Sequence, residues 1–216
     1  MKHERLASLA DGIFAIVMTI LVFQIEIPHL PKTISSYGLA RVILDLYPLF
    51  LSYLLSFSLL FTYWRSHHFI VSVFAKAVDV TLTNINAIFF FFIGLVPFSS
   101  HLLGQYSTVQ TSIIVFSINV ILIGVSLFIM RHYIKHSKSI ENAETTVIEE
   151  QHAYARILFP VLCAIGAIII SFWSKQLSLV FLTLGILFNL MPASTRITFA
   201  IWNTIIGKKD PIGQKV

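Results

Sequence analysis

The first apolar stretch of the chain reads Arg5-Leu-Ala-Ser-Leu-Ala-Asp-Gly-Ile-Phe-Ala-Ile-Val-Met-Thr-Ile-Leu-Val-Phe-Gln-Ile-Glu-Ile27. It is long enough to cross a bilayer as one helix, yet an aspartate, Asp11, lies inside it. An ionised carboxylate in lipid costs roughly 3 kcal/mol unless it is paired or faces water. Asp11 is therefore expected to face a protein interior or a water-filled path. Its partner is either Arg5, almost two helical turns away, or a residue of another helix.

One side of this stretch carries a row of bulky apolar side chains. Ile16, Ile20, Phe23 and Ile27 recur at spacings of four, three and four, which places them on one face of a helix. Thr19 lies beside Ile20. Two interpretations stay open. The row is a packing seam whose threonine bonds to its own helix backbone, or it lines a pore that apolar rings gate by dewetting.

The composition of the chain indicates an integral membrane protein. Of its 216 residues, 56% are hydrophobic and 12% are charged, whereas a soluble domain has about 25% charged residues. The net charge of +5 does not indicate nucleic-acid binding, because the basic residues are distributed by membrane side. The single cysteine, Cys163, lies in an apolar run and is expected to be a small packing residue.

The apolar runs predict an all-α fold with six transmembrane helices in one unit, residues 1–216. Residues 28–45 are expected to form a loop with a turn at Ser35-Ser-Tyr-Gly38, and 131–156 a solvated segment. No Asp, Glu, Lys or Arg occurs from Val80 to Met130, which suits two spans separated near Pro97. The expected spans are 7–27, 46–64, 80–100, 109–130, 157–174 and 177–194.

The basic residues predict the orientation of these six spans. Twelve of the 15 Lys and Arg residues fall on the side of the two termini, and only Lys32, Arg41 and Lys175 fall on the opposite side. Because basic residues are enriched in cytoplasmic loops, both termini are expected in the cytoplasm.

The first helix resembles a known signature. Arg5-x-x-x-Leu9-Ala10-Asp11-Gly12, followed by an apolar run with Thr19, is similar to the Arg-x-x-x-Phe-Ser-Asp-Gly motif of the transmembrane protein 175 family. These are endolysosomal potassium channels and their bacterial relatives. Leucine and alanine stand here where that motif has its aromatic residue and its serine.

Weaker likenesses to the same family follow along the chain. Trp64-Arg-x-His67-His68 resembles its Tyr-Trp-x-x-His-His element at the end of the second span. Asn86 with the later Pro97-Phe resembles its Asn-to-Pro-Phe element. Arg156-x-x-x-Pro160 resembles the start of its fifth span. The likeness therefore extends from Arg5 to about Pro160.

The resemblance implies a homotetramer in the bacterial cell membrane, in contact with lipid, with four copies of the first helix around a central pore. Ile16 would form the main constriction, Ile20 and Phe23 the next two rings, and Thr19 would favour potassium. Phe23 departs from the aliphatic residue usual there. The expected permeant ion is K⁺, modestly preferred over sodium, with proton permeation and no cofactor. No Thr-Val-Gly-Tyr-Gly filter occurs.

The resemblance also gives a structural role to the polar residues at the cytoplasmic ends of the first three spans. They are expected to form a buried network that holds the first helix against its neighbours. The members of this network are Arg5, Asp11, Trp64, His67, His68 and Asn86.

Two other classes of function are weighed against the channel. A proton-coupled small-molecule transporter would use Asp11 with His67 and His68 as a relay, but the chain shows no convincing internal repeat. An intramembrane enzyme is not expected, because neither His-Glu-x-x-His nor Gly-x-Ser-x-Gly occurs. The eight histidines lack metal-ligand spacing apart from the adjacent pair, which points to different sides of a helix, so no metal site is expected.

Overall fold

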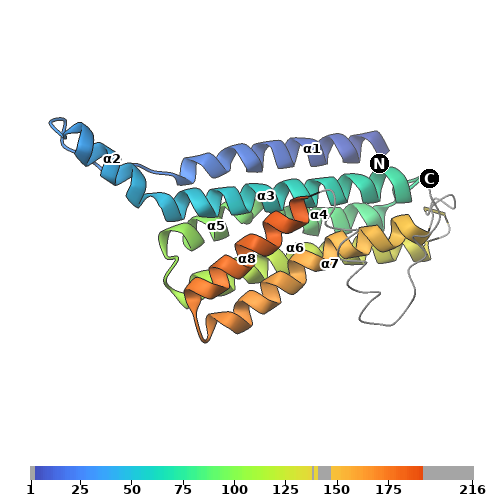
Figure 1. The fold of residues 1–216 in the computed structure, drawn as a ribbon. Coiled ribbons are helices and arrows are strands. Elements are labelled where there is room, and N and C mark those ends of the chain that lie inside the picture. The colour runs from blue at the N-terminus through green and yellow to red at the C-terminus, as the bar shows by residue number, and fades with distance from the viewer. Residues whose placement is uncertain (1–2, 138, 141–146, 192–216) are drawn as a thin grey trace, which may run out of the picture.

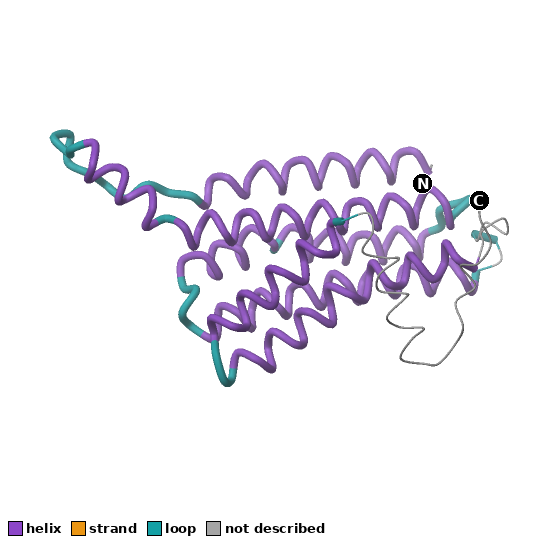
Figure 2. The backbone as a smooth tube through the Cα atoms, in the orientation of Figure 1, coloured by secondary structure: helices purple, strands orange, loops and turns teal. Residues whose placement is uncertain are grey.

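The structure, a computed structural model, describes residues 3–137, 139–140 and 147–191, and these residues form an all-helical bundle (Figures 1 and 2). The expected end of the sixth span at 194 lies outside the described residues. The elements are α1 (His3–Ile20), η1 (Leu21–Gln24), α2 (Ser36–Asp45), α3 (Tyr47–Phe69), η2 (Ile70–Phe74), α4 (Val80–Gly94), α5 (Val96–Gln105), α6 (Gln110–His136), α7 (Val147–Ser171) and α8 (Lys175–Leu190).

Five segments of the described chain are long and apolar enough to cross a membrane. They are Glu4–Gln24, Tyr47–Phe74, Val80–Gln105, Gln110–His136 and Ala153–Ser171. The apolar helix α8 has 16 residues, just under the usual length of a membrane span. The all-helical fold is thus confirmed, with five described segments long enough to cross a membrane and one shorter apolar helix.

The connection between the first two spans differs from the expected loop. Ser35 caps a helix there, because its side-chain oxygen accepts a hydrogen bond from the N–H of Gly38. This helix, α2, has no buried residue and projects beyond the bundle at an angle to α3 (Figure 1). The Ser-Ser-Tyr-Gly run that resembles a turn is therefore the first turn of a helix, since serine suits the N-cap.

Two helices run further than the sequence suggests. The span after α2 continues past Trp64 to Phe69 and then through the π-helical turn η2 to Phe74. The next span is interrupted at Leu95 and resumes as α5, with Pro97 in its first turn. Proline is tolerated there because the first helical N–H groups need no partner within the helix. The polypeptide turns only after Gln105.

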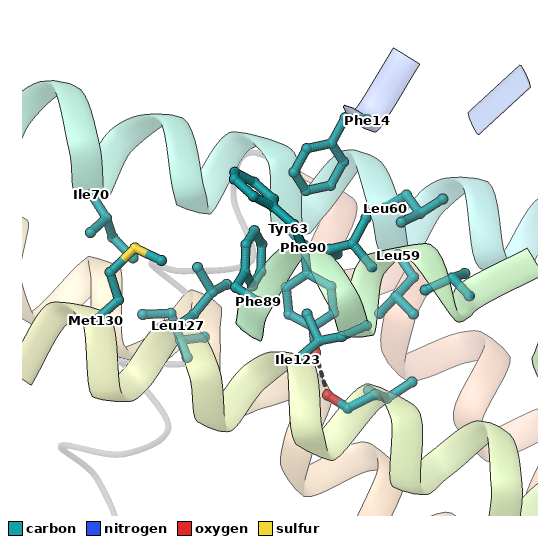
Figure 3. Close-up of a cluster of buried hydrophobic side chains, with 14 of the residues drawn as sticks. Phe14, Leu59, Leu60, Tyr63, Ile70, Phe89, Phe90, Ile123, Leu127 and Met130 are labelled. Atoms are coloured by element: carbon teal, nitrogen blue, oxygen red, sulfur yellow. Dashed lines mark hydrogen bonds between the residues drawn. The ribbon is translucent and has the colours of Figure 1, made fainter. Parts of the chain in front are cut away.

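The core lies where α1, α3, α4 and α6 meet. Figure 3 shows Phe14 of α1 beside Phe89 and Phe90 of α4 and the leucines of α3. Tyr63 is fully buried, and its hydroxyl donates a hydrogen bond to the carbonyl oxygen of Val120 at 3.0 Å. This bond satisfies the one polar atom of an otherwise apolar side chain.

Two close contacts between helices require glycine, at Gly124 and at Gly185. A Cβ atom on Gly124 of α6 would lie 2.2 Å from Cγ2 of Val161 on α7. A Cβ atom on Gly185 of α8 would lie 2.5 Å from the sulfur of Cys163. Cys163 is buried, so it is the small packing residue that the sequence predicts.

The segment 131–156 begins with a buried residue rather than a solvated one. Arg131 is 1% exposed, and its guanidinium carbon lies 3.9 Å from the centre of the Phe74 ring. The expectation of a solvated segment is therefore wrong at Arg131. The reason is that α3 and η2 extend far enough to place an aromatic ring over this position, which favours a cation.

Candidate functional site

Helix α1 and the turn η1 have two distinct faces. One face packs into the subunit and consists of side chains that recur every three or four residues, as a helix requires. Its members are Leu6, Ala10, Phe14, Val17, Leu21 and Gln24.

The opposite face is apolar and largely exposed in the single subunit. Ile16 is 59% exposed, Ile20 is 42% exposed and Phe23 is 75% exposed. Two residues along a helix correspond to about 200° of rotation, so Ile16 points away from the buried Phe14. Helix α1 lies along one edge of the bundle, so its outward face is open (Figure 1). Ile16, Ile20 and Phe23 of the predicted row thus lie on the face that the subunit leaves exposed. Ile27 does not belong to this face, because the helical segment ends at Gln24 rather than at the expected residue 27.

Thr19 belongs to the exposed side of α1, and its hydroxyl bonds to its own helix. The hydroxyl oxygen lies 3.0 Å from the carbonyl oxygen of Ala15 and 2.8 Å from that of Ile16. A carbonyl only accepts, so the hydroxyl donates its proton inward. The lone pairs of Oγ1 are left as acceptors on the exposed side of the helix.

Gln24, which the sequence analysis did not select, ties the last turn of this segment to α5. Its Nε2 donates to the carbonyl oxygen of Pro97 at 2.6 Å, and the side chain is buried. The available signal was its spacing, because Gln24 continues the buried row three residues after Leu21. A polar residue on a buried row must find a partner, and the helix break at Pro97 supplies it.

Asp11 pairs with Trp64 of α3. The indole Nε1–H donates to Oδ1 of Asp11 at 2.8 Å. Arg5 is exposed, and within the described chain no ion pair joins it to Asp11. The sequence placed these three residues in one network, and the structure brings Asp11 and Trp64 into contact while Arg5 stays apart.

His67 forms a second polar pair, deeper in the subunit. Its Nε2 lies 2.7 Å from Oδ1 of Asn86, and the amide nitrogen of Asn86 donates to the carbonyl oxygen of Leu82 at 2.8 Å. The imidazole is 1% exposed and stacks on Phe89 with 3° between the two planes. An amide oxygen only accepts, so His67 donates from Nε2.

His68 lies on the other side of α3 from His67. It is exposed and stacks on the indole of Trp64, with 5.9 Å between the ring centres. In the described residues no hydrogen bond connects the Asp11–Trp64 pair to the His67–Asn86 pair. A proton relay from Asp11 to His67 therefore lacks a hydrogen-bonded path. No cluster of three potential metal ligands occurs among the residues that were placed.

Comparisons with known proteins match the first part of the chain to one family. The family model for the endosomal/lysosomal potassium channel TMEM175 matches residues 5–97. A potassium channel of Chamaesiphon minutus is 34% identical over 102 residues, which are 47% of this chain and 49% of that protein. A potassium channel of Chryseobacterium is 27% identical over 194 residues, 89% of this chain and 94% of that one.

A solved structure resembles most of the chain. The crystal structure of a lysosomal potassium-selective channel TMEM175 homolog from Chamaesiphon minutus superposes with a TM-score of 0.70. The superposition covers 87% of this chain and 95% of that one at 23% identity. The likeness shows a shared fold. In sequence, the chain spans about half the length of the Chamaesiphon relative that it matches.

Proposed function

We propose that this chain is a member of the TMEM175 family, whose model matches its residues 5–97. It is a subunit of a cation channel that conducts K⁺ and prefers it modestly over sodium, with protons as a second permeant ion. Its relatives are named potassium channels rather than enzymes. The channel is a homotetramer in the bacterial cell membrane, and α1 of each subunit lines the central pore.

One observation carries the proposal. The face of α1 opposite its buried row is apolar and exposed in the single subunit, through Ile16, Ile20 and Phe23. Such a face must meet lipid or further copies of the chain. The family match begins with this helix, which favours copies. Four α1 helices around one axis would present these side chains as three successive rings.

Rings of this kind suit a gate. An ion that passes a narrow apolar ring loses water contacts, so the ring blocks conduction until it widens. Thr19 lies between Ile16 and Phe23, and its hydroxyl donates to its own helix. The oxygen therefore offers lone pairs to the axis, where four such oxygens replace part of the hydration shell of K⁺.

The polar pairs hold α1 in position. Asp11 is anchored to α3 through Trp64, and Gln24 is anchored to α5 through Pro97. The His67–Asn86 pair joins α3 to α4 beneath Phe14. His68 stacks on Trp64 at the rim of the subunit, whereas Arg5 is exposed there and has no ion pair with Asp11 in the described residues. With α8 as the sixth crossing, residues 1–216 form one six-helix unit whose termini both lie in the cytoplasm.

Potassium flux through reconstituted vesicles tests this function. Ile16→Asn should raise K⁺ flux because it wets the narrowest ring, and Thr19→Ala should lower the preference for potassium over sodium. Ile169→Asn on α7 is the matched control, since Ile169 is 51% exposed on a different helix. It should leave flux and selectivity unchanged. Flux that responds equally to Ile16→Asn and Ile169→Asn would place the pore elsewhere, and no flux in any variant would remove the channel function.

A further inference from the structure

Two histidines lie side by side in the last turns of α6. His132 and His136 are four residues apart, so the helix places both side chains on one face. Both are exposed, and the centres of their imidazole rings lie 4.2 Å apart. Two histidines of one helix bind a single metal ion at this spacing. The expectation that only the adjacent pair, His67 and His68, comes close enough is therefore wrong.

A hydrogen bond determines which nitrogen of His136 is free. Its Nδ1 lies 2.9 Å from the carbonyl oxygen of His132. A carbonyl oxygen only accepts, so Nδ1 carries the proton and Nε2 of the neutral ring keeps its lone pair. Histidines that bind metals commonly donate their other ring N–H to a backbone carbonyl in this way. Nε2 of His136 is thus an oriented ligand atom on an exposed side chain.

Aromatic contacts hold the ring of His132. It stacks on Phe128, with 17° between the two planes and 6.2 Å between the ring centres. Phe128 in turn lies against Tyr154 of α7, with 5.7 Å between their ring centres. A side chain that is already positioned loses less conformational freedom when it binds a ligand. Both histidines are therefore oriented by contacts that need no metal.

The separation of the two imidazoles allows one ion to reach both. A bond between Zn²⁺ and a histidine nitrogen is about 2.0–2.1 Å long, which places the ion roughly 3 Å from the centre of the ring. Two ring centres 4.2 Å apart can therefore share one ion after a small rotation of the side chains. Imidazole suits zinc, copper and nickel, whereas magnesium and calcium prefer oxygen ligands. Water completes the coordination, because both histidines are exposed.

We propose that His132 and His136 bind one divalent transition-metal ion, such as Zn²⁺, and so fasten the last turn of α6. The ion bridges two successive turns at a helix end, where helices otherwise fray. The chain just after this turn is docked on the connection between α3 and α4, because the N–H of Lys76 donates to the carbonyl oxygen of Ile140 at 2.8 Å. Metal binding therefore stabilises the contact between α6 and that connection.

Thermal unfolding of the full-length protein, purified without a histidine tag and freed of metal with a chelator, tests this site. Zn²⁺ at about a hundred times its dissociation constant should raise the Tm by about 5 °C. Excess EDTA should reverse the shift, and Mg²⁺ at the same concentration should cause none, because imidazole is a poor ligand for it. The absence of a shift with Zn²⁺ in the wild type overturns the proposal.

Variants distinguish a shared ion from separate binding by single histidines. His132→Ala and His136→Ala should each lose most of the Zn²⁺-dependent shift, and the double variant should lose little more, since two ligands of one ion are not independent. His101→Ala is the matched control, because His101 is an exposed histidine of α5, and it should keep the whole shift. The shift of each variant is measured from its own Tm without metal. A full shift in the double variant, or losses that simply add between the two single variants, contradicts the shared site.

Discussion

Helices α1 and α6 are both apolar enough to cross a membrane, but the bundle uses them differently. In the most apolar window of α6, 56% of the residues are buried within the subunit, against 28% in the segment that contains α1. Helix α6 packs on α4, α5 and α7, whereas α1 lies along the edge (Figure 1). A helix whose apolar surface is only partly used inside the subunit has surface left for contacts outside it.

The largest expected effect is the difference in stability between substitutions on the buried face and on the exposed face of α1. Phe14 is 1% exposed and packs near Phe89 and His67, so Phe14→Ala should leave a cavity and destabilise the protein by about 3–5 kcal/mol. Phe23→Ala, at a side chain that is 75% exposed, should change the stability little and raise K⁺ flux by widening its ring. The Tm of the two purified variants and their flux in vesicles check this. Equal loss of stability in both would erase the difference between the faces.

Glycine-to-alanine substitutions in α6 and in α1 should change the stability by smaller and different amounts. Gly124→Ala places a Cβ atom 2.2 Å from a methyl carbon of Val161, so the two helices must shift, at a cost of about 1–3 kcal/mol. A Cβ atom added to Gly12 would have nothing within 4 Å. Gly12→Ala should therefore leave the subunit as stable as the wild type, or stabilise it by up to about 1 kcal/mol.

The two glycine variants also differ in their expected effect on assembly and flux. If α1 faces its own copies, Gly12→Ala alters flux or the oligomeric state on size exclusion even though the thermal stability of the subunit holds. A Gly124→Ala variant as stable as the wild type would contradict the tight α6–α7 contact.

The smallest expected effect lies outside the spans, at Asp79, which caps α4. Burial raises the pKa of this carboxyl, but hydrogen bonds from the Tyr133 hydroxyl and the Leu82 N–H outweigh burial, and the net pKa is lowered. Because the pKa of Asp79 is lower in the folded state, its carboxylate stabilises the protein at pH values above the unfolded pKa of about 4. This stabilisation is lost as the pH falls through the folded pKa.

Asp79→Ala should therefore lower the free energy of unfolding by about 1 kcal/mol at neutral pH. The difference in Tm between this variant and the wild type should shrink as the pH is lowered below about 4. The measurement is a Tm series over pH for both proteins. A difference that grows on acidification would contradict the lowered pKa.

Periodicity predicted the outward face of α1, because one helix alone determines which side chains share a face. Ile16, Ile20 and Phe23 needed no knowledge of their surroundings to be grouped. Asp11 in an apolar run likewise required a partner, and Trp64 was one of the candidates that the sequence offered. Features that depend on one helix or on a single costly charge were thus accessible before the fold was seen.

Features that depend on how helices meet were not accessible. The Trp-Arg-x-His-His run resembles the end of a span, yet α3 continues because His67 is buried against Asn86 of α4. Arg131 resembles a solvated charge, and only the length of η2 reveals the Phe74 ring beside it. The helix break at Pro97 and its bond to Gln24 also join residues far apart in the chain.

Chemical modification of introduced cysteines tests most directly whether the outward face of α1 lines the ion path. Phe23→Cys and Ile169→Cys are each made in a Cys163→Ala background, reconstituted in vesicles and treated with a charged methanethiosulfonate reagent. If α1 lines the pore, K⁺ flux through the Phe23→Cys channel changes strongly on modification, because a charge enters one of the rings, while the Ile169→Cys channel is unaffected. Equal insensitivity of both, with modification at position 23 verified by mass, would contradict it.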